Sequence, residues 1–220
     1  MADDIIEGEA HKIDDVTRGA LKRFLQIGIS LLVQAATLLI SSGRLEWTMA
    51  WIFIGLNVVL ISINALIFLP NPKLRELAAE RSRITFAKSW DKAIGVSLLV
   101  TTEATLITTG LDKRYGWSPQ LPPAIRLVTL AIYTLGYALF TWAMISNIFF
   151  SGIVRIQDDR GHTVATAGPY RYVRHPGYVG YITMSLSTPL SLGSLWALIP
   201  AGLTTCVMAT RTILEDRTLQ

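Results

Sequence analysis

The chain has 220 residues, the size of one domain or at most two, and carries a formal net charge of +4. Hydrophobic residues make up 51% and charged residues only 16%, whereas a typical soluble protein carries about a quarter charged residues. Because the charges also lie between long uncharged runs, the composition excludes a disordered chain, a coiled coil and a water-soluble enzyme with one core. The single cysteine, Cys206, cannot form an internal disulfide, and the three histidines lack the spacing of a zinc site, so we expect no metal.

Residues 1–23 precede the first apolar run, and we expect them to form a cytoplasmic arm. This arm contains six acidic residues, Asp3, Asp4, Glu7, Glu9, Asp14 and Asp15. Their charge is wrong for the n-region of a signal peptide, and the apolar run that follows is long enough to remain as a membrane span. Two conformations stay open for the arm, a helix on the membrane surface and a solvated tail.

Four apolar stretches follow, in a membrane region that we predict over residues 24–150. A helix rises about 1.5 Å per residue and the hydrocarbon core is about 30 Å thick, so a span needs roughly 17 to 25 mostly apolar residues. The stretches that meet this length are 24–41, 47–69, 93–111 and 127–150. Their only acidic or basic residue is Glu103. An ionisable group inside a membrane is a functional candidate, and the alternative is a packing network in which Asn57 and Asn64 hydrogen-bond to it.

The loop 70–92 begins with Pro70-Asn71-Pro72, and we predict an interfacial helix after these prolines. The apolar face of this helix is formed by Leu74, Leu77 and Ala78. Its basic residues, which can reach lipid phosphates, are Arg75, Arg81 and Arg83. The loop therefore serves either as a lid or substrate guide, or as a connector that follows the membrane surface.

A fifth apolar stretch spans the 36 residues 175–210, which contain no Lys, Arg, Asp or Glu. This length corresponds to about 54 Å of helix, nearly enough to cross a bilayer and return. We predict a helical hairpin whose bend lies around Pro189, Ser191, Gly193 and Ser194. The fold class is therefore an all-α, polytopic integral membrane protein with four transmembrane helices and a C-terminal helical hairpin.

The basic residues predict the orientation, because positive charge accumulates on the cytoplasmic side of a membrane protein. With a cytoplasmic N-terminus, 16 of the basic residues lie inside and only four lie outside, namely Arg44, Lys113, Arg114 and Arg126. We therefore expect a multi-pass protein with both termini in the cytoplasm.

The segment 151–180 is neither a span nor a short loop, and it lies beside the cytoplasmic face. It contains two of the three histidines and five glycines. Polar, glycine-rich backbone beside lipid is costly unless it is buried in protein or surrounds a ligand, and we favour the ligand. Four of its glycines permit close backbone approach: Gly161, Gly168, Gly177 and Gly180. Two nearby tyrosines, Tyr172 and Tyr181, fit an aromatic belt at the membrane interface better than a site.

The sequence GPYRYVRHPGYVG at residues 168–180 is similar to the GPY-x-x-x-RHP-x-Y-x-G motif of the isoprenylcysteine carboxyl methyltransferase family. This family belongs to a wider group of membrane methyltransferases that includes phospholipid N-methyltransferases. The resemblance extends upstream to RIQDDRGHTV and downstream to RTILEDRTL, and it covers about residues 147–220. The region 151–220 is therefore predicted to hold the cofactor-binding segment and the hairpin, with the active site in the cytoplasm.

The resemblance implies a pocket for S-adenosylmethionine. Its predicted cofactor-binding residues are Gln157, His162, Thr163, Val164, Ala165, Tyr170, His175, Pro176, Gly177, Tyr178 and Glu215. Glutamate can accept hydrogen bonds from ribose hydroxyls, and the helix start after Pro176 offers backbone donors for a carboxylate. Arg211 matches the family position that faces the methyl acceptor, where a guanidinium can orient a carboxylate by paired hydrogen bonds.

Two departures from the family pattern accompany this resemblance. The family usually has two adjacent glutamates where this chain has Glu215-Asp216, and the shorter second side chain reaches less far. Relatives generally continue with an aromatic, Gly/Tyr-containing tail after the position of Gln220. Two explanations are compatible with this difference: a pocket that no tail covers, or a natural chain that is longer than this sequence.

The resulting prediction is a membrane enzyme that methylates a lipid or lipidated small molecule, most simply the carboxylate of an isoprenylcysteine-type acceptor, with no nucleic-acid partner. The runner-up acceptor is a phospholipid amine. Two rivals stay open: a sterol-type reductase that uses NADPH and carries a similar RHP-x-Y stretch, and a non-catalytic membrane scaffold.

Overall fold

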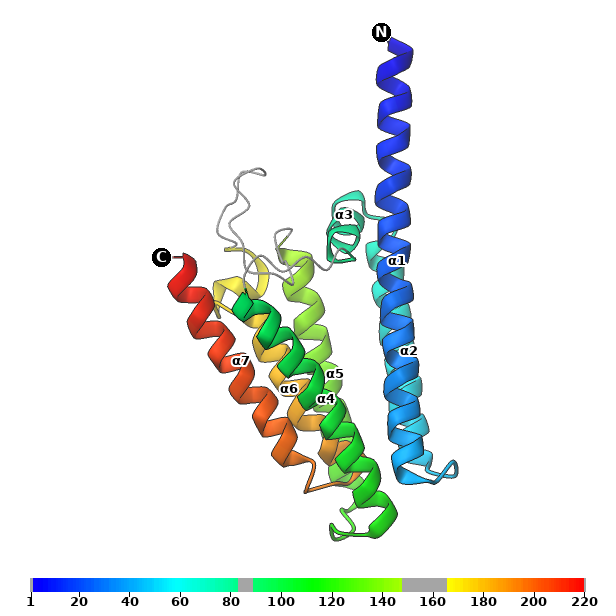
Figure 1. Ribbon diagram of the computed structural model, residues 1–220, viewed down its shortest axis with the longest axis vertical. Coiled ribbons are helices and arrows are strands. Elements are labelled where there is room, and N and C mark those ends of the chain that lie inside the picture. Colours follow the sequence, from blue (N-terminus) through cyan, green and yellow to red (C-terminus); the bar gives the residue numbers. More distant parts are fainter. Residues whose placement is uncertain (1, 83–88, 148–165, 220) are drawn as a thin grey trace.

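The computed structural model describes residues 2–82, 89–147 and 166–219, and the regular structure in these ranges is entirely helical (Figure 1). The helices in chain order are α1 (Ala2–Ser42), α2 (Thr48–Phe68), α3 (Pro72–Arg81), α4 (Ser89–Tyr115), α5 (Pro123–Ser146), the short 3₁₀ helix η2 (Gly168–Arg171), α6 (Pro176–Leu192) and α7 (Leu198–Leu219). The all-α prediction is confirmed.

Four helices are long and apolar enough to cross a membrane in the described part of the chain. They are Ile13–Ser42 within α1, Thr48–Phe68, Trp90–Tyr115 within α4 and Pro123–Ser146. Each of them overlaps one of the four predicted spans, and the first begins eleven residues before the predicted start at residue 24. The N-terminal arm is not a separate element, because α1 runs without a break from Ala2 through the first span.

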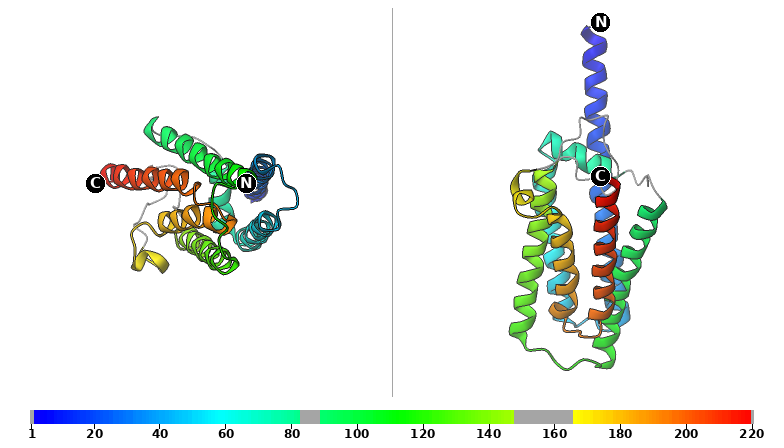
Figure 2. Two further views of the ribbon diagram at one scale, coloured as in Figure 1. Left: turned by 90° about the horizontal axis from the view of Figure 1, so that it is seen from below. Right: turned by 90° about the vertical axis from the view of Figure 1, so that its left-hand side faces the viewer.

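The helix ends alternate, so that both termini lie at the end of the bundle where α3 and η2 are also found (Figures 1 and 2). Helices α6 and α7 form an antiparallel hairpin that packs against α5 and α4 (Figure 1). This arrangement fits the prediction that both termini lie on the same side of the membrane.

The predicted bend of the hairpin is confirmed at Gly193, which ends α6 in the left-handed conformation with φ +89°. A glycine adopts this conformation without the steric cost of a Cβ atom. The Ser194 amide donates to the Pro189 carbonyl at 2.8 Å, which closes the helix end. The buried Asp112 carboxylate of α4 then fixes the turn, since it accepts hydrogen bonds from Ser194 Oγ at 2.5 Å, Ser118 Oγ at 2.5 Å and Ser118 N at 2.7 Å.

We expect Asp112→Asn to lower the free energy of unfolding by about 1–3 kcal/mol, because an amide nitrogen cannot accept the hydroxyl hydrogen bonds and leaves buried donors unpaired. Thermal unfolding in detergent measures the effect. Glu46→Gln, which removes the same charge from an exposed position at that end of the bundle, is the control. Equal unfolding temperatures for the two variants would show that the Asp112 contacts do not hold the turn.

Helices α5 and α6 approach each other with backbone against backbone. A Cβ atom on Gly180 would lie 2.6 Å from the Gly136 carbonyl oxygen and 2.8 Å from the Phe140 nitrogen. Gly168, with φ +58°, lies against the side chain of Ser146 of α5. The prediction that these two glycines make room for a ligand is wrong for the described contacts, since the space at Gly180 and Gly168 is taken by α5 itself.

Helix α3 is confirmed as the predicted helix after the prolines, and Asn71 caps it by accepting a hydrogen bond from Lys73 N at 3.1 Å. Its apolar face does not contact lipid as predicted but packs on α1, where a Cβ atom on Gly19 would lie 2.8 Å from Ala79 Cβ. Arg81 therefore turns toward the bundle, and its Nη1 donates to Met144 Sδ at 3.3 Å. The prediction that Arg81 reaches lipid phosphates is wrong.

The asparagines of α2 bond to tyrosines of α5 and not to Glu103. Tyr133 donates to Asn57 Oδ1 at 2.6 Å, and Asn64 Nδ2 donates to the Tyr137 hydroxyl at 2.7 Å. Asn57 Nδ2 donates to the Phe53 carbonyl at 2.9 Å, so the predicted network around Glu103 does not form. Leu99 and Ile107, one turn on either side of Glu103, are both exposed, which places Glu103 on the outer face of α4.

Candidate functional site

The start of α6 and the end of α7 meet at one end of the hairpin, because the two helices run antiparallel (Figure 1). Pro176 occupies the first turn of α6, where its missing N–H costs nothing, and the preceding His175 lies at the helix N-cap. The hairpin thereby brings residues 175–178 beside residues 211–216, which are more than thirty positions away in the sequence.

Four side chains make a connected network at this meeting point. His175 Nε2 lies 3.0 Å from Asp216 Oδ1, and the His175 ring stacks on the Tyr178 ring with centroids 5.3 Å apart and an interplanar angle of 5°. The Tyr178 hydroxyl donates a hydrogen bond to Glu215 Oε2. Both members of the acidic pair therefore contact the RHP-x-Y stretch, and the shorter Asp216 side chain still reaches a motif residue.

Arg211 extends the network from α7 to α4. Its Nη2 donates to Asp91 Oδ1 at 3.1 Å, and the two side chains are only 11% and 2% exposed. The guanidinium carbon lies 5.8 Å from the centroid of the Tyr178 ring, within the range of a cation–π contact. Sequence reasoning missed Asp91, because it placed this residue in the loop 70–92, whereas the structure places it in the first turn of α4.

Tyr170 borders the same site from η2. Asn147, at the end of α5, donates to its hydroxyl at 3.5 Å. Burial raises the pKa of Tyr170, and the nearby Glu215 carboxylate raises it further. Tyr170 therefore keeps its proton at neutral pH and offers an aromatic face and a hydroxyl near Glu215. Asn147 is a second residue that sequence reasoning missed, since it looked like the polar end of a span.

The remaining predicted residues divide into two groups. Pro176 and Gly177 are buried at the start of α6, next to His175 and Tyr178. The others lie outside the described residues: Gln157, His162, Thr163, Val164 and Ala165. No group of three or more His, Cys, Asp or Glu side chains within the described ranges could hold a metal ion.

The carboxylate, the aromatic rings and the helix start at this site suit a ligand that consists of a nucleoside joined to a charged amino acid. Glu215 supplies a carboxylate acceptor for ribose hydroxyls, and Tyr178 and Tyr170 supply flat aromatic surfaces. The first turn of α6, which begins at Pro176, directs the positive end of a helix dipole at the site, which suits a carboxylate. These residues therefore fit the predicted cofactor.

The comparisons with known proteins bear on this part of the chain. Residues 127–220 match the model of the isoprenylcysteine carboxyl methyltransferase (ICMT) family. This match covers 94 of the 220 residues, which is less than half of the chain. The resemblance predicted from the motif is thereby confirmed, and the ICMT match contains all of the network residues except Asp91.

A relative supports the resemblance to this family over a shorter stretch. The chain is 39% identical over 66 residues to a protein-S-isoprenylcysteine O-methyltransferase of Schizosaccharomyces pombe. The aligned stretch is 30% of this chain and 28% of that protein, so the chain covers less than a third of the length of this relative. No solved structure matches the chain.

Proposed function

We propose that this chain is a membrane methyltransferase that uses S-adenosylmethionine to methylate the carboxylate of a lipid-like, isoprenylcysteine-type acceptor. The observation that carries the proposal is the convergence of His175, Tyr178 and Glu215 in the segment that matches the ICMT family. These residues come from two helices and share one network, as a common cofactor pocket requires.

The proposed roles follow from the chemistry of each residue. Glu215 holds the ribose hydroxyls, Tyr170 and Tyr178 cover the nucleoside, and His175 with the Pro176-Gly177 turn binds the methionine part. The proposed pocket also includes Gln157, His162, Thr163, Val164 and Ala165. The cofactor supplies an electrophilic methyl group on a sulfonium when it is bound.

Arg211 is proposed to orient the acceptor carboxylate, with Asp91 fixing the guanidinium from the other side. A carboxylate is already a nucleophile, so one of its oxygens forms the new C–O bond as the C–S bond breaks, and no proton moves. Catalysis then rests on positioning and on exclusion of water. We also propose that this end of the bundle, with both termini, faces the cytoplasm, in accordance with the basic residues that surround it.

The proposal is tested by adding S-adenosylmethionine with a labelled methyl group to the full chain in membranes and extracting the lipids. We expect label in a base-labile methyl ester. Calorimetry with S-adenosylhomocysteine and with NADPH distinguishes a methyltransferase from a reductase. Binding of NADPH alone refutes the proposal. Binding of S-adenosylhomocysteine without any methyl transfer supports the non-catalytic scaffold instead.

The pH dependence distinguishes a carboxylate acceptor from an amine. We expect the rate of methyl transfer to change less than about threefold between pH 6 and pH 8, because a lipid carboxylate is ionised throughout this range. An ammonium acceptor must first lose a proton, so its rate would rise by about tenfold per pH unit below the pKa of the amine. A steep rise of that kind would favour a phospholipid amine as the acceptor.

A further inference from the structure

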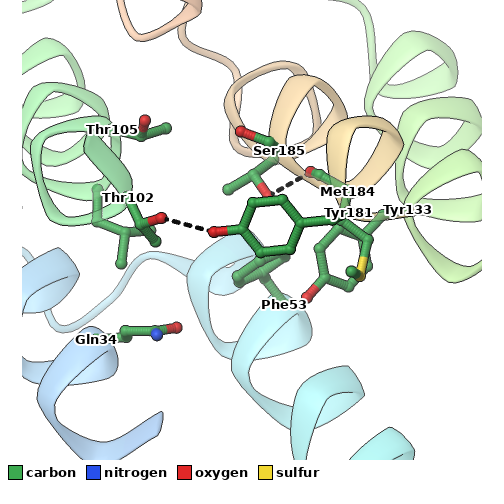
Figure 3. A pocket seen from close by; sticks show the side chains of 10 residues that line it. Gln34, Phe53, Thr102, Thr105, Tyr133, Tyr181, Met184 and Ser185 are labelled. Carbon is green, nitrogen blue, oxygen red and sulfur yellow. Dashed lines mark hydrogen bonds between the residues drawn. The ribbon is translucent and has the colours of Figure 1, made fainter. Parts of the chain in front are cut away.

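Two cavities meet at Tyr181 of α6 in the interior of the helix bundle. The larger one, of about 420 Å³, lies beneath α3 between α1, α2, α5 and α6, and the smaller one, of about 180 Å³, lies beside α4. Gln34, Tyr181 and Met184 line both cavities (Figure 3). Tyr181 is therefore a cavity residue and not the interface-belt aromatic that the sequence predicted.

The Tyr181 ring reaches from α6 toward α4. Its hydroxyl lies 3.2 Å from Thr102 Oγ1, as the dashed line in Figure 3 shows. This hydrogen bond joins side chains on two different helices, so it holds the ring across the space between them. The described residues of α4 line only the smaller cavity, namely Thr102, Thr105 and Leu106. The ring therefore separates the larger cavity from the space beside α4.

The larger cavity adjoins the proposed methyl-transfer site. Arg81 lines its end beneath α3, and Arg211 and Tyr178 lie close enough for their charges to act on Arg81. Tyr178 also lies three residues before Tyr181 on α6, which is a little less than one helical turn. An acceptor whose carboxylate is held at Arg211 therefore meets the Tyr181 ring when its chain extends into the larger cavity, and the smaller cavity lies behind this ring.

The smaller cavity is suited to hydrocarbon, because three hydroxyl donors on its wall already have acceptors. Thr105 and Thr188 each donate to the carbonyl four residues earlier in their own helix, at 2.8 Å and 2.9 Å. Tyr133 donates to Asn57 Oδ1 at 2.6 Å. None of these three donors loses a hydrogen bond when a hydrocarbon chain fills the space. The smaller cavity is thus closed to such a chain mainly by the volume of the Tyr181 ring.

We propose that Tyr181 is a specificity-determining residue that limits the length of the chain on the methyl acceptor, because its ring keeps the end of the chain out of the smaller cavity. This inference rests on the proposed function, since it concerns the acceptor of the same reaction. The smaller cavity would add about two fifths to the volume of the larger one. One isoprene unit adds a third to a chain of three units, so the space behind the ring matches the step from three units to four.

Equilibrium binding to the full chain in phosphatidylcholine nanodiscs tests this role. The two probes are N-acetylcysteines with S-linked chains of three and of four isoprene units, and the measured quantity is the ratio of their affinities. Comparison of this ratio between proteins cancels the different partition of the two probes into lipid. Tyr181→Ala is expected to shift the ratio at least about tenfold toward the longer chain. An unchanged ratio would overturn the inference.

Matched variants show whether the volume of the ring is responsible. Tyr181→Phe keeps the ring and loses only the Thr102 hydrogen bond, so the ratio should move by less than about threefold. Tyr115→Ala makes the same change as Tyr181→Ala at an exposed position of α4 and should leave the ratio within about twofold. An effect of Tyr181→Phe as large as that of Tyr181→Ala would contradict a role for the ring volume.

Refilling the smaller cavity tests where the longer chain lies. Ser185 lines only the smaller cavity, so Ser185→Phe in the Tyr181→Ala protein should return the ratio to within about threefold of the wild type. Failure of this rescue would show that the longer chain does not use the smaller cavity. Tyr181→Leu removes less volume and should shift the ratio at least about threefold in the same direction, which keeps the test available if Tyr181→Ala does not fold.

Methyl transfer from S-adenosylmethionine to the same two probes separates this inference from the proposed function. A shifted affinity ratio in Tyr181→Ala without methyl ester formation in any of the proteins refutes the proposed function and leaves the role of Tyr181 in place. Methyl ester formation with the same chain preference in the wild type and in Tyr181→Ala overturns the inference and leaves the proposed function in place.

Discussion

Replacement of Glu215 by alanine is expected to lower the rate of methyl transfer by about 100-fold or more and to weaken the binding of S-adenosylhomocysteine to a similar extent. The carboxylate accepts the Tyr178 hydrogen bond and is proposed to hold the ribose hydroxyls, so the change removes a charged acceptor and leaves a half-buried phenol unpaired. Each factor of ten corresponds to about 1.4 kcal/mol. Labelled methyl transfer and calorimetry measure the two effects.

Two further variants separate this role from a general loss of structure. Arg217→Ala changes an exposed residue two positions along α7 and should leave both measurements within about twofold. Glu215→Gln keeps an oxygen for the Tyr178 hydroxyl but loses the charge, so it should fall between the wild type and the alanine variant. If Glu215→Ala binds S-adenosylhomocysteine normally, Glu215 is not part of the cofactor pocket.

The helices themselves were predictable from the sequence, because the hydrocarbon thickness fixes how many apolar residues a span needs. The same reasoning failed at the ends of the spans. Residues 2–12 carry charges that interrupt the apolar pattern, yet the backbone of α1 continues through them. The charge pattern predicts where the membrane span ends, but it does not predict where the helix ends, because a helix can extend beyond the membrane into water.

The site was predictable only in part. The composition of residues 151–180 indicated only a ligand site of unknown identity, because polar, glycine-rich backbone beside a membrane is costly. The resemblance to the family supplied His175, Tyr178 and Glu215, and the structure brings these three side chains together. The partner of Arg211 was not predictable, because Asp91 lies 120 positions away on α4 and outside the ICMT match. Pairwise contacts of this kind depend on how the helices pack, and no local pattern encodes them.

The roles of Arg81 and Gly180 were predicted wrongly for the same reason. Arg81 looked like a lipid-phosphate ligand because its helix is amphipathic, but the α3 contact with Gly19 of α1 turns it inward. Gly180 lies within a ligand motif, yet its missing side chain is filled by the backbone of α5. A glycine indicates that something approaches closely, and only the structure identifies what it is.

The contact between α5 and α6 at Gly180 gives the largest expected effect on folding. Gly180→Ala should lower the free energy of unfolding by about 3 kcal/mol, and Gly180→Leu should prevent the recovery of folded protein. The added Cβ atom would lie 2.6 Å from the Gly136 carbonyl oxygen and 2.8 Å from the Phe140 nitrogen, and backbone atoms cannot move aside as the end of a flexible side chain can. Thermal unfolding in detergent measures the first variant, and size-exclusion chromatography the second.

Gly202→Ala is the matched control, because Gly202 lies inside α7 with nothing within 4 Å of its added Cβ atom. Alanine is the better helix former, so this variant should be neutral or more stable by up to about 1 kcal/mol. The two alanine substitutions thus have opposite expected signs for the same chemical change. His175 and Tyr178 lie at the start of α6, and Gly180 lets this helix pack against α5. Gly180→Ala should therefore also weaken the binding of S-adenosylhomocysteine, whereas Gly202→Ala should not. Equal stability of the two variants would show that α5 and α6 do not pack backbone against backbone at Gly180.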